Sequence, residues 1–365
     1  MNSIVTVGKK FIKLEYVRKL VVGKLKGFCL VFNAQESTMS QLSLSDQYVT
    51  DIKKFIPKLT SDLRKGQCGR IGVIGGSAEY TGAPYFSAIS ALKLGADLVY
   101  VFCCKAAAPV IKSYSPELIV LPILDDKDVV QKIESWLPRL HALVIGPGLG
   151  RDPDILQNVT AIINYCSEKV KPLLPLVIDA DGLYVVQNNI SLIQKYTGPV
   201  ILTPNGIEYC RLSSSLSLSD PLQIATSLNS VVLHKGSSDV IVNGISNMKL
   251  NLTLQNVLIK CDVTGSVRRC GGQGDILSGC IATFVAWYEL HRRNNQSLEG
   301  NSKDCNQDNL NYFKTNLLGY SLSCYAGCVL TRTCSRLAFK EFGRSMTASD
   351  MIPFINKAFE SNFGE

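Results

Sequence analysis

The sequence predicts an α/β fold with a largely parallel central sheet and helices on both faces, arranged in three layers. Seven short runs rich in Val, Ile and Leu each end near Gly, Asp, Asn or Pro, which is typical of strands buried on both faces of a parallel sheet. Between the runs lie amphipathic or small-residue segments, such as residues 83–96, that are long enough for crossover helices. The 365 residues are 46% hydrophobic, so the chain can bury a core of this kind.

The expected strands come first along the chain and the longest helices come last. The strands are predicted at residues 69–76, 97–103, 117–123, 142–148, 175–182, 200–206 and 231–244. A helix is expected over 274–290, followed by a polar stretch at 291–312 that we interpret as an exposed insertion between helices. A long helical region then ends near Phe363. Thr347 and Asp350 have the spacing of a capping box that begins the last helix.

The first 40 residues differ from the rest of the chain. The net charge is +8, and residues 1–34 hold seven basic residues against one acidic residue. We expect residues 1–40 to be an extension outside the fold, either a mitochondrial presequence or a disordered or helical extension, and residues 47–363 to form a single domain. The protein is accordingly expected in mitochondria or in the cytoplasm. The domain itself carries little excess charge and no span-length apolar run, so we expect neither a nucleic-acid partner nor a membrane span.

Several kinds of site are disfavoured by residue spacing. The 13 cysteines include no C-x-x-C pair, which argues against a disulfide framework or a zinc site and for free, mostly buried thiols. His141 and His234 border strands without a Ser or Cys partner nearby, so we interpret them as structural histidines. Residues 72–84 lack the Lys of a Walker motif, and residues 146–150 lack the spacing of a dinucleotide-binding fingerprint.

Polar and glycine residues cluster where the predicted strands end. They are Gly146, Gly148 and Gly150 after one strand, Asp179 and Asp181 after the next, Asn205 and Glu208 after a third, and Lys235 and Asp239 after a fourth. Because the carboxyl ends of parallel strands meet at one edge of a sheet, these loops predict a ligand site there. Any one of them could instead simply turn the chain, since Gly and Asp are common turn residues.

The glycine-rich segment at residues 267–279 is the most specific indication of a ligand-binding site in the sequence. Gly271, Gly272 and Gly274 leave the backbone free of Cβ atoms where a helix is expected to begin, so its N–H groups can bind an anion. Asp275 follows directly and is either a helix cap or a base beside that anion.

These segments together resemble a known family. The segments are residues 79–103, 115–120, 144–152, 177–183, 202–208 and 268–279, with the Lys235–Asp239 stretch. Their sequences and their order along the chain are similar to those of the eukaryotic ATP-dependent NAD(P)H-hydrate dehydratases, which are ribokinase-like enzymes. The resemblance covers about residues 47–363. It implies a ribokinase-like fold and a hydro-lyase that converts the S epimer of hydrated NADH or NADPH back to the coenzyme while ATP is cleaved to ADP and phosphate. It also implies that phosphorylation of the ring hydroxyl precedes elimination.

The resemblance further implies roles for individual residues. Asp275 is the expected catalytic base. The expected ATP-binding residues are Lys235, Gly236, Ser237, Ser238, Asp239, Gly271, Gly272, Gln273 and Gly274. The expected substrate-binding residues are Ala83, Gly148, Gly150, Asn205, Gly206, Ile207, Glu208, Tyr209, Cys210, Arg211 and Asp275. Asn205 and Glu208 would also help to hold Mg²⁺ through water.

Two other functions remain open on the sequence. A ribokinase-like kinase of a small alcohol or vitamin would share the glycine turn and Asp275, and a catalytically silent nucleotide-binding protein would share the fold. The expected ligands are hydrated NADH or NADPH and ATP, with Mg²⁺ as cofactor. An NAD(P)H-hydrate epimerase is the expected functional partner, without a required stable contact, and a homo-oligomer is compatible with the sequence.

Overall fold

The central sheet positions every loop of interest in this protein. The computed structural model describes residues 44–244, 258–299 and 308–364. Nine strands form one sheet in the order β3-β2-β1-β4-β5-β6-β7-β8-β9. They are β1 (Arg70–Ile74), β2 (Leu98–Cys103), β3 (Ile119–Pro122), β4 (Ala142–Ile145), β5 (Leu176–Ile178), β6 (Val200–Leu202), β7 (Val231–His234), β8 (Asp239–Asn243) and β9 (Leu258–Cys261). Strands β1 to β7 are parallel, as the sequence predicts, and the pairs β7–β8 and β8–β9 are antiparallel.

Two of these strands differ from the prediction. Residues 231–244 were expected as one strand, but they form the hairpin β7–β8, because the turn at Gly236–Ser238 reverses the chain. Strand β9 was not expected, since its four residues alternate between exposed and buried and lack the continuous apolar pattern of the inner strands.

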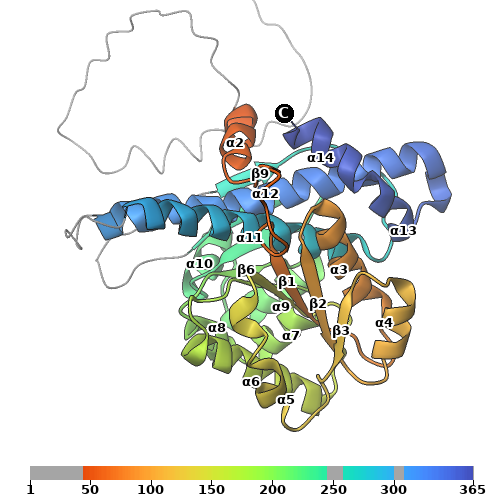
Figure 1. Ribbon diagram of the computed structural model, residues 1–365, viewed down its shortest axis with the longest axis vertical. Coiled ribbons are helices and arrows are strands. Elements are labelled where there is room, and N and C mark those ends of the chain that lie inside the picture. Colours follow the sequence, from red (N-terminus) through yellow and green to blue (C-terminus); the bar gives the residue numbers. More distant parts are fainter. Residues whose placement is uncertain (1–43, 245–257, 300–307, 365) are drawn as a thin grey trace, which may run out of the picture. The chain divides into compact units, whose positions relative to one another are not determined.

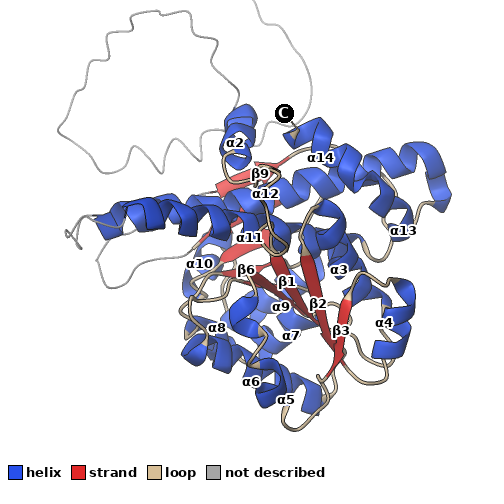
Figure 2. Cartoon of the chain, in the orientation of Figure 1, coloured by secondary structure: helices blue, strands red, loops and turns tan. Residues whose placement is uncertain are grey.

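Helices cover both faces of the sheet, which gives the expected three layers (Figures 1 and 2). The core on one face includes residues of α2 (Leu44–Lys53), α3 (Gly82–Leu94), α4 (Ala108–Tyr114), α11 (Gln273–Glu299), α12 (Asp308–Phe342), α13 (Ala348–Met351) and α14 (Ile355–Phe363). The core on the other face includes residues of α5 (Val129–Ile133), α6 (Pro153–Lys169), α7 (Asp181–Asn188), α8 (Ile190–Gln194), α9 (Gly206–Leu216) and α10 (Pro221–Ser227).

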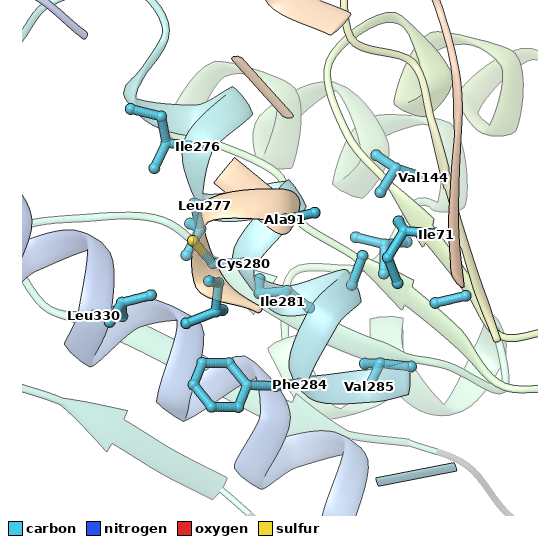
Figure 3. Packing of buried hydrophobic residues seen from close by; sticks show 14 of the residues in the cluster. Ile71, Ala91, Val144, Ile276, Leu277, Cys280, Ile281, Phe284, Val285 and Leu330 are labelled. Carbon is cyan, nitrogen blue, oxygen red and sulfur yellow. The ribbon is translucent and has the colours of Figure 1, made fainter. Parts of the chain in front are cut away.

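Helix α11 is held tightly against the sheet by its apolar residues. Figure 3 shows Cys280, Ile281 and Phe284 of α11 among neighbouring side chains of the core. A Cβ at Gly279 would lie 2.0 Å from the carbonyl oxygen of Ser87, so only glycine allows α3 to approach α11 this closely. This packing fixes the position of the first turn of α11.

The polar stretch at residues 291–312 is largely helical where it is described. Helix α11 continues to Glu299 and α12 begins at Asp308, so both helices extend into the stretch that was interpreted as an insertion. Polar residues favour solvent exposure but many of them also favour helix, so polarity alone does not end a helix. Near the C-terminus, the backbone N–H of Thr347 donates to Asp350 at 2.8 Å, which confirms the predicted cap at the start of α13. Residues 352–354 then form a 3₁₀ turn, so the expected last helix is divided.

Most cysteines are buried, and His141 and His234 make structural contacts, in the described part of the chain. Nine of its eleven cysteines are buried, and all eleven are free thiols. Nδ1 of His141 accepts a hydrogen bond from the backbone N–H of Arg70 at 3.1 Å, and burial lowers the pKa of His141 to about 4. His234 stacks on Tyr209, with ring centroids 4.2 Å apart. Among the helices of the described residues, none is long and apolar enough to cross a bilayer.

Candidate active site

An ion pair joins the ends of two inner strands at the carboxyl edge of the sheet. Lys235 follows β7, and its Nζ lies 2.7 Å from Oδ1 of Asp179, which follows β5. The hydroxyl of Thr203, directly after β6, donates to the same oxygen at 2.7 Å. The Asp179 side chain is only 3% exposed, so three neighbouring strands fix the carboxylate and its charge partner. The convergence of loops predicted from the sequence is present at this edge.

Asp275 lies beside this pair, in the first turn of α11. Burial raises the pKa of Asp275 to about 7; the charges of Asp179 and Glu208 also raise it, and the charge of Lys235 opposes them. Burial alone would lower the pKa of Lys235, but Asp179, Glu208 and Asp275 outweigh this effect and raise it. Among the described residues, no hydrogen bond makes the Asp275 carboxylate a helix cap. Asp275 is therefore a carboxyl group that changes protonation near neutral pH beside a fixed cation, as a general base requires.

Two large cavities meet at the start of α11. The first cavity, of about 830 Å³, lies between the loop after β7, residues 262–267 after β9, and the helices α11 and α12. The second cavity, of about 960 Å³, lies between the loops after β1 and β4 and the start of α6. Gly274 lines the first cavity and Asp275 lines the second. Two residues that are adjacent in sequence therefore line two different cavities, one residue each.

The predicted site residues fall into four groups by position. Those that line the first cavity are Lys235, Gly236, Ser237, Asp239, Gln273 and Gly274, together with Asn205, which was expected with the substrate residues. Those that line the second cavity are Ala83, Gly148, Gly150 and Asp275. Glu208 and Arg211 line a third cavity of about 90 Å³. Ser238, Gly206, Ile207, Tyr209, Cys210, Gly271 and Gly272 line none of the three.

Gly274 leaves open space in the first cavity. A Cβ built on Gly274 would have its nearest contact 3.5 Å away, at Nζ of Lys235. The protein itself therefore does not require glycine at this position, whereas a ligand that approaches the backbone would. Gly272 differs, because its φ of +92° and the 2.6 Å distance from a built Cβ to Cβ of Ala348 both require glycine for the turn.

Asn205 and Glu208 form the N-terminal cap of α9. Oδ1 of Asn205 accepts hydrogen bonds from the N–H groups of Ile207 and Glu208, both at 3.0 Å, and Oε2 of Glu208 accepts one from the N–H of Asn205 at 2.8 Å. Burial raises the pKa of Glu208, and the charge of Lys235 opposes the shift. Within the described ranges, no group of three or more His, Cys, Asp or Glu residues could hold a metal.

Arg332 of α12 positions the loop after β7, and sequence reasoning missed it. Its Nε lies 2.6 Å from Oδ2 of Asp239, and its guanidinium donates to the carbonyl oxygens of Gly236 and Ser237, both at 2.9 Å. Asp239 also accepts a hydrogen bond from the N–H of Gly236 at 3.0 Å. A single Arg in a long helix, 93 residues from Asp239, carries no motif that would have identified it.

Comparison with known proteins gives one consistent family. Residues 71–357 match the family model described as NAD(P)H-hydrate dehydratase. The chain is 61% identical over 319 residues to the ATP-dependent (S)-NAD(P)H-hydrate dehydratase of Pediculus humanus subsp. corporis, covering 87% of this chain and 98% of that protein.

Solved structures show the same fold at low sequence identity. A ribokinase-like superfamily protein from Enterococcus faecalis has a TM-score of 0.60 and 19% identity, covering 91% of this chain and 100% of the other. The ADP/ATP-dependent NAD(P)H-hydrate dehydratase from Bacillus subtilis, co-crystallized with ATP/Mg²⁺, has a TM-score of 0.57 and 20% identity, covering 86% of this chain and 97% of the other. The predicted ribokinase-like fold is confirmed.

Proposed function

The chain belongs to the NAD(P)H-hydrate dehydratase family, and on this premise we propose that it is an ATP-dependent (S)-NAD(P)H-hydrate dehydratase. It returns the S epimer of hydrated NADH or NADPH to the coenzyme, with release of ADP and phosphate. The observation that supports this most directly is the placement of Gly274 and Asp275 on two different cavities. One cavity can hold ATP and the other the hydrated nicotinamide, with the transferring phosphoryl group between them.

Asp275 begins the reaction as the general base. As the ring hydroxyl attacks the γ-phosphorus of ATP, Asp275 accepts the hydroxyl proton, an O–P bond forms, and the bond from phosphorus to the β–γ bridging oxygen breaks to release ADP. Hydroxide is a poor leaving group, whereas phosphate is a good one. The lone pair of the ring nitrogen then expels phosphate, and loss of a proton from the adjacent ring carbon restores the double bond. A base with a pKa of about 7 suits this proton transfer at neutral pH.

Lys235 and the start of α11 stabilise the charge that moves. The N–H groups at Gly274 lie at a helix N-terminus, where partial positive charge favours phosphoryl oxygens. Nζ of Lys235 lies 3.5 Å from the position of a Gly274 Cβ, so it can add a full charge to the same oxygens. Arg332 keeps the Lys235–Asp239 loop in place through Asp239.

Mg²⁺ is proposed as the cofactor, held chiefly by ATP oxygens and water. When bound, it supplies positive charge that offsets the charge of the phosphate groups. The side chains of Asn205 and Glu208 both carry oxygen atoms of the kind that Mg²⁺ prefers as ligands. However, Oδ1 of Asn205 already accepts hydrogen bonds from two backbone N–H groups. Glu208 lines the third cavity and not the first, so it would reach a hydrated Mg²⁺ on ATP only through water, with Oε2 held by the N–H of Asn205.

The test is recovery of the reduced coenzyme. The purified chain is mixed with hydrated NADPH, ATP and Mg²⁺, and both the absorbance of reduced nicotinamide and the release of free phosphate are followed. We expect one phosphate for each coenzyme regenerated. Phosphorylation of hydrated NADPH without release of free phosphate would indicate a kinase instead of a dehydratase. No turnover of hydrated NADPH would leave a kinase of a small alcohol or vitamin and a silent nucleotide-binding protein, which ATP consumption in the presence of such alcohols distinguishes.

The compartment and the assembly are also proposed from the sequence. We propose that residues 1–40 direct the chain to mitochondria, with a cytoplasmic protein as the alternative. A full-length fusion to a fluorescent protein would then enter mitochondria, whereas a fusion that begins at Gln41 would not. Light scattering would measure whether the chain is a homo-oligomer. We also propose that the enzyme acts on the product of an NAD(P)H-hydrate epimerase without forming a stable complex with that epimerase.

A further inference from the structure

Acidic residues predominate among the charged residues that line the second cavity. Six carboxylates line it, from Glu79, Asp125, Asp152, Asp154, Asp181 and Asp275, whereas Arg151 is the only Lys or Arg among its described lining residues. A hydrated dinucleotide carries a diphosphate with two negative charges. Among the charged side chains that line this cavity, only that of Arg151 would attract the diphosphate.

Arg151 is held in a position where it can receive an anion. Its guanidinium lies 4.5 Å from the ring centre of Tyr184, and its Nε is 3.3 Å from Oδ1 of Asp181. Its side chain remains 54% exposed, so donors are available to a ligand. Arg151 lines both the second cavity and the small third cavity, in which Arg211 lies.

Ser77 supplies an independent indication of a ligand beside Arg151. Ser77 is only 5% exposed and lines the second cavity, and its Oγ has no hydrogen-bond partner in the described structure. A buried hydroxyl without a partner is unfavourable, so such a group at a cavity wall points to a ligand that completes it. A Cβ built on Gly150 would lie 3.3 Å from this Oγ. Ser77 and Arg151 thus flank the same glycine.

We propose that Ser77 and Arg151 form the subsite for the diphosphate of the hydrated dinucleotide. This inference rests on the proposed function and adds two positioning residues to it. The Arg151 guanidinium pairs with the diphosphate oxygens. The Ser77 Oγ is closed to solvent in this structure, so its hydroxyl donates to one of these oxygens after the side chain rotates toward the cavity. With the diphosphate held there, the hydrated ring extends into the second cavity toward Asp275, and the adenosine half extends toward Arg211.

The first experiment measures steady-state kinetics of Arg151→Gln with hydrated NADPH and ATP. Loss of a charge-assisted hydrogen bond corresponds to roughly 10- to 100-fold in binding, so the KM for hydrated NADPH should rise by about that factor while the KM for ATP stays within twofold. Arg151→Lys should recover part of the loss, because it keeps the charge. Arg139→Gln is the matched control, since Arg139 also lies over an aromatic ring, that of Trp136, but lines none of the three cavities. An unchanged KM for hydrated NADPH in Arg151→Gln would overturn the proposal.

The second experiment tests Ser77 in the same way. Ser77→Ala should raise the KM for hydrated NADPH several-fold, whereas Ser230→Ala should not. Ser230 is the matched control because its hydroxyl is also buried without a hydrogen-bond partner in the described structure, but it lines neither large cavity. Equal kinetics for both variants would remove Ser77 from the subsite.

A binding experiment separates this inference from the proposed function. With a non-hydrolysable ATP analogue at saturation, so that the phosphate site of the first cavity is occupied, inorganic pyrophosphate should further raise the thermal midpoint of the wild-type chain and of Arg139→Gln, but not that of Arg151→Gln. In turnover assays it should compete with hydrated NADPH. If the wild type turns nothing over but shows this shift, the proposed function fails and the anion subsite stands. If pyrophosphate shifts Arg151→Gln as much as the wild type, or competes only with ATP, the subsite fails whether or not the enzyme is active.

Discussion

Replacing Asp275 with asparagine should abolish turnover and at the same time stabilise the fold. The amide has nearly the same shape as the carboxylate but cannot accept the proton, and loss of a general base typically removes about 100- to 10,000-fold of the rate. The stability effect follows from the pKa of Asp275, which burial and the carboxylates of Asp179 and Glu208 raise from 3.8 to about 7. A group with a raised pKa in the folded state favours folding while protonated, and this contribution is lost as pH rises through about 7.

The magnitude of the stabilisation depends on pH. Above pH 7 the folded wild-type protein holds an ionised carboxylate that would be more stable in the unfolded chain, at a cost of about 4 kcal/mol if one pKa unit is worth 1.36 kcal/mol. The neutral amide does not have this cost. Urea unfolding should therefore show Asp275→Asn to be more stable than the wild type at pH 8, with a smaller difference at pH 5.

Two results would refute this reasoning. Turnover of Asp275→Asn within threefold of the wild type would show that Asp275 is not the base. A stability difference that is the same at pH 5 and pH 8 would show that the carboxyl group does not titrate with a raised pKa. Leu277→Ala, a change in the next turn of α11, is the control for a general effect on the helix and should destabilise the protein at both pH values.

Three further predictions concern the same site. The kcat/KM for hydrated NADPH should increase as pH rises through about 7, because burial raises the pKa of Asp275 and only the ionised form accepts a proton; a flat profile between pH 5.5 and pH 8.5 would contradict this. Gly274→Val should reduce turnover much more than it reduces the urea midpoint, since the new side chain enters the first cavity, and normal turnover of ATP would disprove the anion-binding role. Arg332→Gln should raise the KM for ATP and destabilise the fold by about 3–5 kcal/mol, because it leaves the buried Asp239 carboxylate without its ion-pair partner; a variant with normal ATP kinetics would show that the loop holds its position without Arg332. 

The sequence predicts the inner strands and the edge at which the site lies, because both depend on local patterns. Short apolar runs that end in Gly, Asp, Asn or Pro favour buried strands, and the residues after parallel strands meet at one edge of the sheet. The proximity of Lys235 and Asp179 follows from that single step. Asp275 does not follow a strand, and its place in the site was expected from the glycine-rich turn and the family resemblance. Strand β9 was not predicted, because its residues alternate between exposed and buried, and this alternation depends on what covers each face of the strand.

The division of the site into separate cavities could not be predicted from sequence. Asn205 and Glu208 are three residues apart, yet Asn205 lines the first cavity and Glu208 the third, because the first turn of α9 directs them differently. Arg332 and Ser77 were also missed. Their roles arise from an ion pair across the fold and from a missing hydrogen bond, and neither feature exists until the chain is folded.

Gly274 and Asp275 are each unfavourable for the fold, and this links stability to function at the first turn of α11. Glycine in a helix costs up to about 1 kcal/mol relative to alanine, and the space around Gly274 would admit a Cβ. Asp275 adds a partly buried charge above pH 7. Substitutions that relieve either cost would fill the phosphate space or remove the base. A search for stabilised variants of this chain should therefore return substitutions at both positions, and those variants should be the ones that have lost activity.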